Sequence, residues 1–175
     1  MGDPRKQRKK FSKPGHPWQR ERILAEKEIL KQYGLKRKNE IWKMTSMLQK
    51  FLHRAKTIIA QTNPQSEIEK TQLLARLHLL GLLKQDSRIE DVLNLTLKDI
   101  MERRLQTLLC RKNIAPSMMQ ARQFITHEHV AVGSKKITVP SYLVLITEEP
   151  NIKLVRTLQT APPQKTEKTE EVKQE

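Results

Sequence analysis

The sequence has few of the residues on which common cofactor sites depend. Its 175 residues include one cysteine, Cys110, and five glycines. A single cysteine excludes an intramolecular disulfide and a multi-cysteine zinc site. The glycines are too widely spaced to form a GxGxxG or a GxxxxGK[ST] loop, which excludes the common nucleotide-dependent enzymes. We therefore expect no cofactor, no metal and no catalytic residue.

Apolar residues are also scarce. The chain is 37% hydrophobic and 4% aromatic. No run approaches the roughly 18 consecutive apolar residues of a membrane span. The first residues lack the apolar core of a signal peptide. We therefore expect a cytoplasmic protein that does not enter a membrane.

Positive charge is what the sequence has in excess. Lysine and arginine number 34 against 19 aspartate and glutamate residues, a formal net charge of +15. The excess is concentrated in residues 1–56 and 97–160, whereas 57–96 and 161–175 are close to neutral. Two separate basic blocks indicate two contacts with a polyanion, which we interpret as the phosphate backbone of a nucleic acid.

Residues 1–20 form a basic arm in which almost nothing apolar precedes Trp18. Such a segment becomes ordered only beside phosphates, where each cation releases condensed counterions. A solvated tail without a function is the alternative. The contacts that we expect in the arm are Arg5, Lys6, Arg8, Lys9 and Lys10.

Residues 21–95 are expected to form a helical domain. The spacing of apolar residues predicts a helix from Glu21 that ends at Gly34, and a third helix between Ser66 and Gly81. A second helix lies between these two, with Asn39 as its cap. Its apolar stripe consists of Ile41, Met44, Leu48, Phe51, Ala55 and Ile58.

Three cations of this second helix, Lys43, Lys50 and Arg54, lie off the apolar stripe. The helix is thus apolar toward a core and positive toward solvent, and it could lie across a nucleic-acid groove. An ordinary surface helix would have the same pattern. We expect the three cations to contact a nucleic acid.

A second group of cations follows Thr96, which is expected to cap one continuous helix. Its apolar face consists of Leu97, Met101, Leu105 and Leu108. Arg104 and Arg111 are seven residues apart and would share a face, with Arg103 and Lys112 beside them. Guanidinium groups bind phosphate oxygens with bidentate geometry, so this surface is expected to face the phosphates of a nucleic acid. Replacement of both Arg103 and Arg104 should then weaken nucleic-acid binding and leave the fold intact.

A shorter helix follows, predicted by Ser117 and Gln120 in the S-x-x-Q pattern of a capping box. Gln120 and Arg122 stand near its N-terminus, where free backbone N–H groups could also bind a phosphate. A β-hairpin is predicted next, with Lys135 and Lys136 after its Gly133-Ser134 turn. Residues 142–146 and 152–155 are further candidate strands.

Taken in order, several motifs resemble the alpha-L RNA-binding domain of the family of the fourth protein of the small ribosomal subunit. They are Glu102-Arg103-Arg104-Leu105-Gln106-Thr107, Ser117-Met118-Met119-Gln120-Ala121-Arg122-Gln123, His129-Val130 and Pro140-Ser141-Tyr142-Leu143-Val144. The turn Gly15-His16-Pro17-Trp18 resembles the one found in the archaeal and eukaryotic branch of this family. The chain departs from the family at Pro116, where relatives usually have a basic residue.

The resemblance implies a mainly α fold with a small α+β domain. It comprises the basic arm (1–20), the helical domain (21–95), an alpha-L domain of two helices and short strands (96–156) and a disordered tail (157–175). It implies that Arg103, Arg104, Ser117, Gln120, Arg122 and His129 face RNA.

The resemblance further implies a structural constituent of the cytoplasmic small ribosomal subunit. Such a protein binds the 5′ domain of small-subunit ribosomal RNA, nucleates assembly and supports translational accuracy near the messenger RNA entry. The partners implied are this RNA, messenger RNA near the entry site and neighbouring ribosomal proteins, notably the fifth of the small subunit.

Two other functions share the alpha-L domain. RNA-modifying and RNA-charging enzymes carry it beside a catalytic domain, for which the remaining helical residues are too few. A translation or quality-control factor that visits ribosomes would need no long basic arm.

Overall fold

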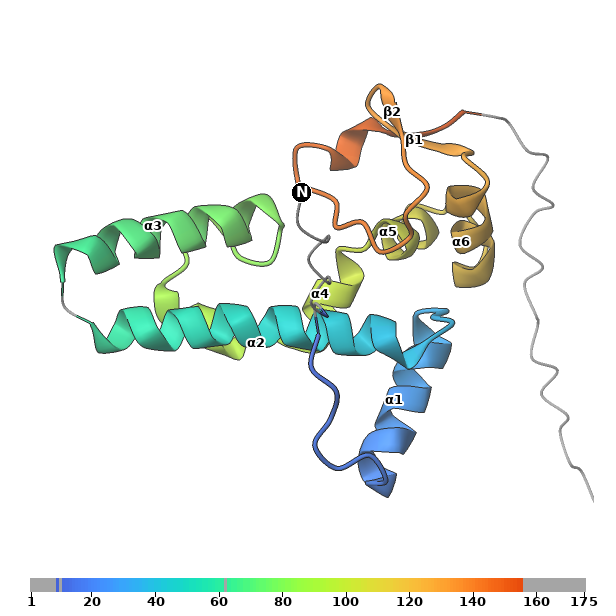
Figure 1. Cartoon of the computed structure of the whole chain (residues 1–175). Helices are drawn as coiled ribbons and strands as arrows, with labels where there is room; N and C mark the ends of the chain where they lie inside the picture. The colour runs from blue at the N-terminus through green and yellow to red at the C-terminus, as the bar shows by residue number, and fades with distance from the viewer. Residues whose placement is uncertain (1–8, 10, 62, 156–175) are drawn as a thin grey trace, which may run out of the picture.

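The computed structural model describes residues 9, 11–61 and 63–155. They form a helical platform and, beside it, a small unit that contains a three-stranded antiparallel sheet (Figure 1). The predicted class, mainly α with a small α+β domain, is confirmed. Arg5, Lys6, Arg8 and Lys10 of the arm and the tail 157–175 lie outside the described residues.

The first two helices follow the predicted periodicity. Helix α1 spans Arg20–Gln32 and ends before Gly34, whose φ of +57° favours glycine. Helix α2 spans Lys38–Ala60, so it begins one residue before Asn39 and the predicted Asn39 cap is wrong. The predicted stripe is confirmed, because all of its members are buried except Leu48, which packs against the core from a half-buried position.

Helix α3 spans Pro64–Leu79 and returns along α2 (Figure 1). It begins two residues before the predicted Ser66 because Pro64 has the fixed φ that suits the first helical position and needs no N–H partner there. Its predicted end at Gly81 is confirmed, with φ at +71°.

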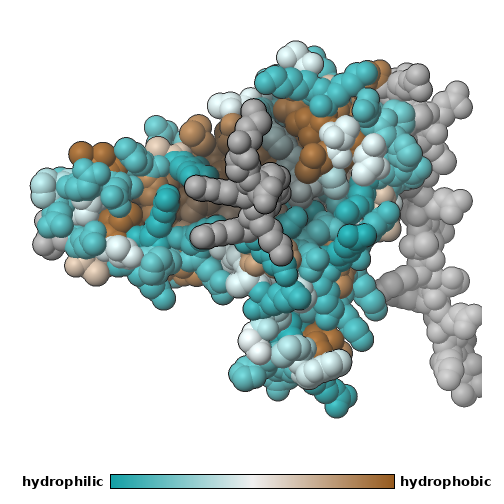
Figure 2. Space-filling model, viewed as in Figure 1, coloured by the Kyte–Doolittle hydropathy of each residue, from teal (hydrophilic) through white to brown (hydrophobic). Residues whose placement is uncertain are grey.

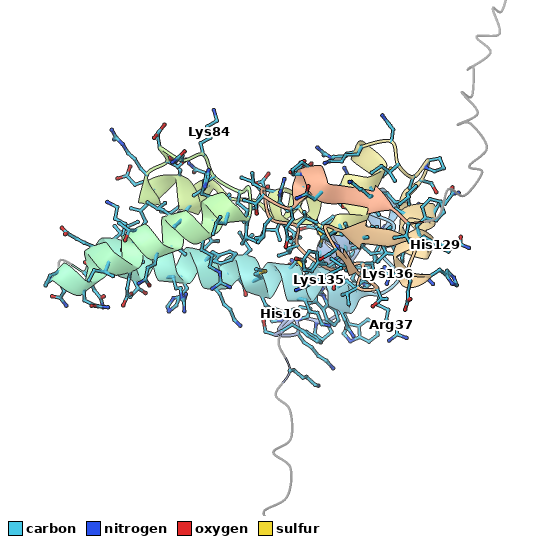
Figure 3. The ribbon with its side chains drawn as sticks, turned by 90° about the horizontal axis from the view of Figure 1, so that it is seen from above. His16, Arg37, Lys84, His129, Lys135 and Lys136 are labelled. Carbon is cyan, nitrogen blue, oxygen red and sulfur yellow. The ribbon has the colours of Figure 1, made fainter. Side chains whose placement is uncertain are left out.

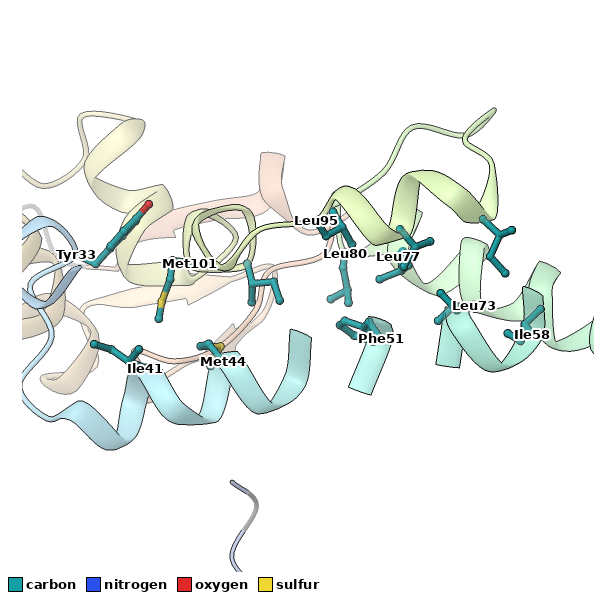
Figure 4. Close-up of a cluster of buried hydrophobic side chains, with 14 of the residues drawn as sticks. Tyr33, Ile41, Met44, Phe51, Ile58, Leu73, Leu77, Leu80, Leu95 and Met101 are labelled. Atoms are coloured by element: carbon teal, nitrogen blue, oxygen red, sulfur yellow. The ribbon is translucent and has the colours of Figure 1, made fainter. Parts of the chain in front are cut away.

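One hydrophobic cluster joins α2, α3, the 3-10 helix η1 (Ile89–Asn94) and α4 (Leu97–Glu102) (Figure 4). Phe51 and Ile58 of α2 and Leu73 and Leu77 of α3 belong to it. Each fully buried side chain of this size contributes roughly 1.5–3 kcal/mol. The platform is therefore held by the apolar faces, and its cations are left at the surface.

The helix predicted from Thr96 is broken into α4 and α5 (Leu105–Arg111), so the single continuous helix is wrong. Thr96 is the N-cap residue of α4 as predicted, and its N–H donates to Asp99 at 2.8 Å. At the break, the backbone pairs with a distant segment: the Leu105 N–H donates to the Tyr142 carbonyl at 2.8 Å. This hydrogen bond replaces the one that the Leu105 N–H would make within a continuous helix.

Residues 142–146, predicted as a strand, form no strand. They contribute a single bridge, between Leu143 and Arg104, at the break between α4 and α5. The predicted hairpin is confirmed as β1 (Val130–Val132) and β2 (Lys135–Lys136), and β3 (Ile152–Leu154) pairs with the other side of β1.

A second hydrophobic cluster joins α5, α6 (Met118–Thr126) and the sheet. The 3-10 helix η2 (Glu149–Asn151) leads into β3. Ile100 and Met101 of α4 belong to the first cluster and Leu105 begins the second. The domain bounds 21–95 and 96–156 stay predictions. Among the described helices, none combines the length and hydropathy needed to cross a bilayer.

Candidate nucleic-acid interface

A basic groove lies between α2 and α3. Its lining residues are Lys43, Met47, Lys50, Phe51, His53 and Arg54 of α2 and Arg76 of α3, and its volume is about 540 Å³. The four lysines and arginines are exposed, whereas Phe51 is buried beneath them. The structure thus brings the three predicted cations of α2 to one hollow, which we call the basic groove.

Sequence reasoning missed Arg76, which it treated as an ordinary surface residue. Arg76 lies between Leu73 and Leu77, the two buried residues through which α3 packs on the platform core. The sequence did contain a signal for Arg76, namely its position beside that apolar stripe. Residues that flank the buried face of a helix border the helix packed against it.

The N-terminus of α6 opens into a second hollow of about 550 Å³. Ser117 caps the helix as predicted, with its Oγ accepting from the Gln120 N–H at 3.2 Å. Gln120 and Arg122 line the hollow, together with Lys36 from the loop before α2. Sequence reasoning missed Lys36. This hollow, which we call the α6 hollow, combines cations with the positive end of the helix dipole.

Arg104 does not face solvent, and its predicted place on an RNA-facing helix surface is wrong. Its side chain is 1% exposed, and its Nη2 donates to Glu40 Oε2 at 2.7 Å. The break between α4 and α5 turns Arg104 inward, so that it and Arg111 do not share an outer face.

Arg103 is also held by the protein rather than presented to solvent. Its Nη1 donates to Glu149 at 2.9 Å and its Nη2 to the Val144 carbonyl at 3.1 Å. The guanidinium lies against Gly81, where an added Cβ would stand 2.8 Å from the Arg103 Cζ. The paired arginines therefore brace segments of the fold.

Three other predicted cations form ion pairs with carboxylates of the protein. Arg111 forms an ion pair with Glu102, and Lys112 lies near Glu149, with its Nζ 3.9 Å from Oε1. Arg122 donates to Glu40 from both terminal nitrogens, at 3.2 and 3.0 Å. These three charges are therefore partly neutralised by neighbouring carboxylates.

The hairpin carries exposed cations that are not paired within the described part of the chain. Lys135 and Lys136 are exposed, and His129 is half-buried beside His127, with 6.3 Å between the ring centroids. Figure 3 shows His129 and Lys136 toward one end of the molecule, with Lys84 well apart from them. Across residues 9, 11–61 and 63–155, no three His, Cys, Asp or Glu side chains gather as metal ligands.

Glu40 joins the platform to the small unit of α5, α6 and the sheet, which we call the alpha-L unit after the domain expected there. It accepts from Arg104 of the α4–α5 break and from Arg122 of α6. Burial by itself raises the pKa of the Glu40 carboxyl, but hydrogen bonds from Arg122 and Arg104 and the charges of both guanidinium groups hold this pKa below its usual value of 4.5. The ionised carboxylate is thus the form that the fold stabilises.

This pairing predicts a loss of stability in acid. Because the pKa of Glu40 is lower in the folded than in the unfolded chain, its contribution is complete above the unfolded value and is lost as pH falls through the folded value. We expect the free energy of unfolding to decline as pH drops below 4.5. Urea denaturation followed by circular dichroism across this range measures the decline.

Glu40→Gln should reduce this dependence on pH, and the variant should be less stable than the parent near neutrality. Part of the acid sensitivity should persist, because Glu26 is paired with Arg22 and Lys38 and its pKa is also held below the usual value. Glu28→Gln, which changes an exposed carboxylate on α1, is the matched control. An identical pH profile for the two variants would contradict the role of Glu40.

Comparisons with known proteins match most of the chain. The S4 domain family matches residues 103–149. The chain is 47% identical over 174 residues to small ribosomal subunit protein uS4 of Methanococcus aeolicus, a match that covers 99% of this chain and 98% of that protein. It is 46% identical over 149 residues to the protein of the same name from Ignicoccus hospitalis, covering 85% and 90% of the two chains. The corresponding protein of Saccharolobus solfataricus is 45% identical over 150 residues, covering 85% and 83%.

Proposed function

The chain belongs to the family of small ribosomal subunit protein uS4, and on this premise we propose that it binds the 5′ domain of small-subunit ribosomal RNA as a structural constituent rather than an enzyme. Members of this family are cytoplasmic proteins of the small ribosomal subunit that have an S4 RNA-binding domain. The basic groove is the observation that carries the proposal of direct RNA contact.

The cations of the basic groove are available to an external anion. Lys43, Lys50, Arg54 and Arg76 form no ion pair with another described residue. An A-form RNA helix hides its base edges in a deep major groove and presents phosphates and 2′-hydroxyls. A row of exposed cations over an apolar floor therefore suits the backbone of folded RNA, with affinity derived mainly from phosphate neutralisation and shape.

A second RNA segment would bind on the alpha-L unit. The α6 hollow contributes Lys36, Ser117 and Gln120, and the hairpin contributes Lys135 and Lys136. Contacts by Lys9, Arg111, Lys112, Arg122 and His129 remain part of the proposal. Arg104 is left out of it, and Arg103 has the bracing role described above.

We further propose that the chain nucleates subunit assembly and supports translational accuracy near the messenger RNA entry, beside the fifth protein of the small subunit. A protein that contacts RNA on both of its structural units can hold two RNA segments in one arrangement. The ion pairs of Glu40, which tie these units together, support this function because they fix the relative position of the two surfaces.

Charge removal in the basic groove tests the proposal. Lys50→Gln combined with Arg54→Gln is expected to weaken binding to a transcript of the 5′ domain of Methanococcus aeolicus small-subunit RNA. It should also lower the slope of log affinity against log salt by about one for each phosphate that the variant no longer neutralises. Filter binding across a salt series measures both quantities.

The matched control is Lys70→Gln combined with Lys84→Gln, which removes the same charge from exposed lysines outside the groove. It should retain nearly all of the affinity and slope of the parent chain. Equal losses in the two double variants would show that net charge, and not the groove, determines binding.

A further inference from the structure

Trp18 leaves an unusually large apolar surface in water. The residue is 90% exposed, the highest value among the large exposed hydrophobic residues of the described chain. A tryptophan can bury about 150–250 Å² of surface when it is covered. The basic groove and the α6 hollow do not include it. A residue in this position is suited to contact a partner.

The turn that carries Trp18 is braced before any partner binds. Arg22 Nη2 donates to the carbonyls of His16 and Pro17, each at 2.9 Å, and these are the two residues directly before Trp18. Pro17 also restricts the backbone of the turn. The turn stands at the start of α1, the end of that helix away from the sheet (Figure 1).

Arg22 is itself held in place by α1 and α2. Its Nη1 pairs with the buried carboxylate of Glu26. Glu26 also accepts from the Trp42 Nε1 at 3.0 Å and lies 3.1 Å from the Lys38 Nζ. Because these contacts fix the turn in the free chain, little ordering entropy is lost when a flat ligand covers Trp18.

The surroundings of Trp18 favour a nucleic acid as that ligand. From Pro4 to Arg20 the sequence contains no acidic residue. Lys13 and Arg20, which flank the turn, are both exposed. Proteins that hold unpaired nucleotides combine an aromatic platform for a base with cations along the backbone, and every base offers a face for stacking. An acidic protein surface would satisfy the cations but not the exposed ring.

We propose that Trp18 stacks on an unpaired base of the small-subunit RNA and that the turn braced by Arg22 is a built single-strand contact. This inference rests on the proposed function and names the form of RNA recognised at one further site: a nucleotide outside a helix. Phosphates adjacent to that nucleotide lie beside Lys13 and Arg20. Figure 2 shows a mainly hydrophilic surface over α1, as expected of a face that meets the backbone of a nucleic acid.

Binding variants of the full chain test the affinity that Trp18 supplies. Trp18→Ala is expected to weaken binding to the Methanococcus aeolicus 5′ domain transcript by about 5-fold to 100-fold, the range that corresponds to the loss of one stacked base. Trp18→Phe keeps a ring and should recover most of that loss. Leu24→Ala, which removes an apolar side chain that is 48% exposed on α1, is the matched control and should bind like the parent.

Tryptophan emission tests the contact directly. Trp18 and Trp42 are the only tryptophans, so Trp18→Phe reports Trp42 alone and the difference in emission between the parent chain and this variant reports Trp18. Stacking on a base should quench the emission of Trp18 and shield it from acrylamide when the transcript is added. Trp42, which is partly buried against Glu26, should change little.

The outcomes separate this inference from the proposed function. If the parent chain binds the transcript but Trp18 emission stays constant and Trp18→Ala binds equally well, the stacking is wrong and the proposed function stands. If the parent chain does not bind the transcript, both are wrong. Quenching of Trp18 by a neighbouring ribosomal protein but not by the transcript would also overturn the stacking.

Discussion

Replacing Arg104 with alanine is expected to lower the free energy of unfolding by about 3 kcal/mol, because the change breaks a buried ion pair on one side and removes a large buried side chain. The Arg104 guanidinium is almost completely shielded from water and lies 2.7 Å from Glu40. Its loss would leave the Glu40 carboxylate with Arg122 alone and would open a cavity beside Met101. This differs from the expectation, drawn from the sequence, that the arginine pair can be removed without harm to the fold.

Arg111→Ala, at the C-terminal end of α5, provides a matched control. The Arg111 side chain is 55% exposed and pairs with Glu102 at the surface. Exposed ion pairs contribute about 0–1 kcal/mol. Urea denaturation followed by circular dichroism should therefore separate the two variants clearly, and equal stabilities would contradict a structural role for Arg104.

A rise in salt is expected to reduce affinity for the 5′ domain transcript by about a thousandfold between about 50 and about 200 mM, as for proteins that make roughly six or more phosphate contacts. Each neutralised phosphate releases condensed counterions, and added salt opposes that release. The proposed lysine and arginine contacts without a carboxylate partner in the described chain are Lys9, Lys36, Lys43, Lys50, Arg54, Arg76, Lys135 and Lys136.

The Trp18→Ala variant gives this experiment an internal control. Stacking is less sensitive to ions than phosphate contact, so this variant should bind more weakly at each salt concentration and keep the slope of the parent chain. A slope near zero for the parent would show that the cations do not contact phosphates. The basic groove would then be an ordinary solvated surface.

Most of the fold could be predicted from local patterns. The six-residue stripe of α2 repeats with helical spacing, and the structure buries it as expected. Gly34 and Gly81 mark helix ends because each has a backbone conformation that glycine adopts readily. Ser117 caps α6 because its hydroxyl is within reach of the Gln120 N–H. All of these signals act between residues that are close in the sequence.

The candidate interface could be predicted only in part, and the errors have one origin. Charge patterning placed Lys43, Lys50 and Arg54 on an outer helix face, and the structure brings them to the basic groove. The same reasoning placed Arg104 outside, because an apolar spacing that continues through Leu108 conceals the break in the helix. The break depends on the segment around Tyr142, which lies far along the chain.

The sequence by itself determined the helical stripes, the hairpin, the excess of positive charge and the resemblance to a ribosomal protein family. Only the tertiary structure decided which cations have a carboxylate partner within the described fold. Glu40 and Arg104 are 64 residues apart, and Arg22 reaches back to the turn before Trp18. Local periodicity reports how neighbouring residues are oriented, whereas the pairing of a charge depends on which distant carboxylate the completed fold places beside it.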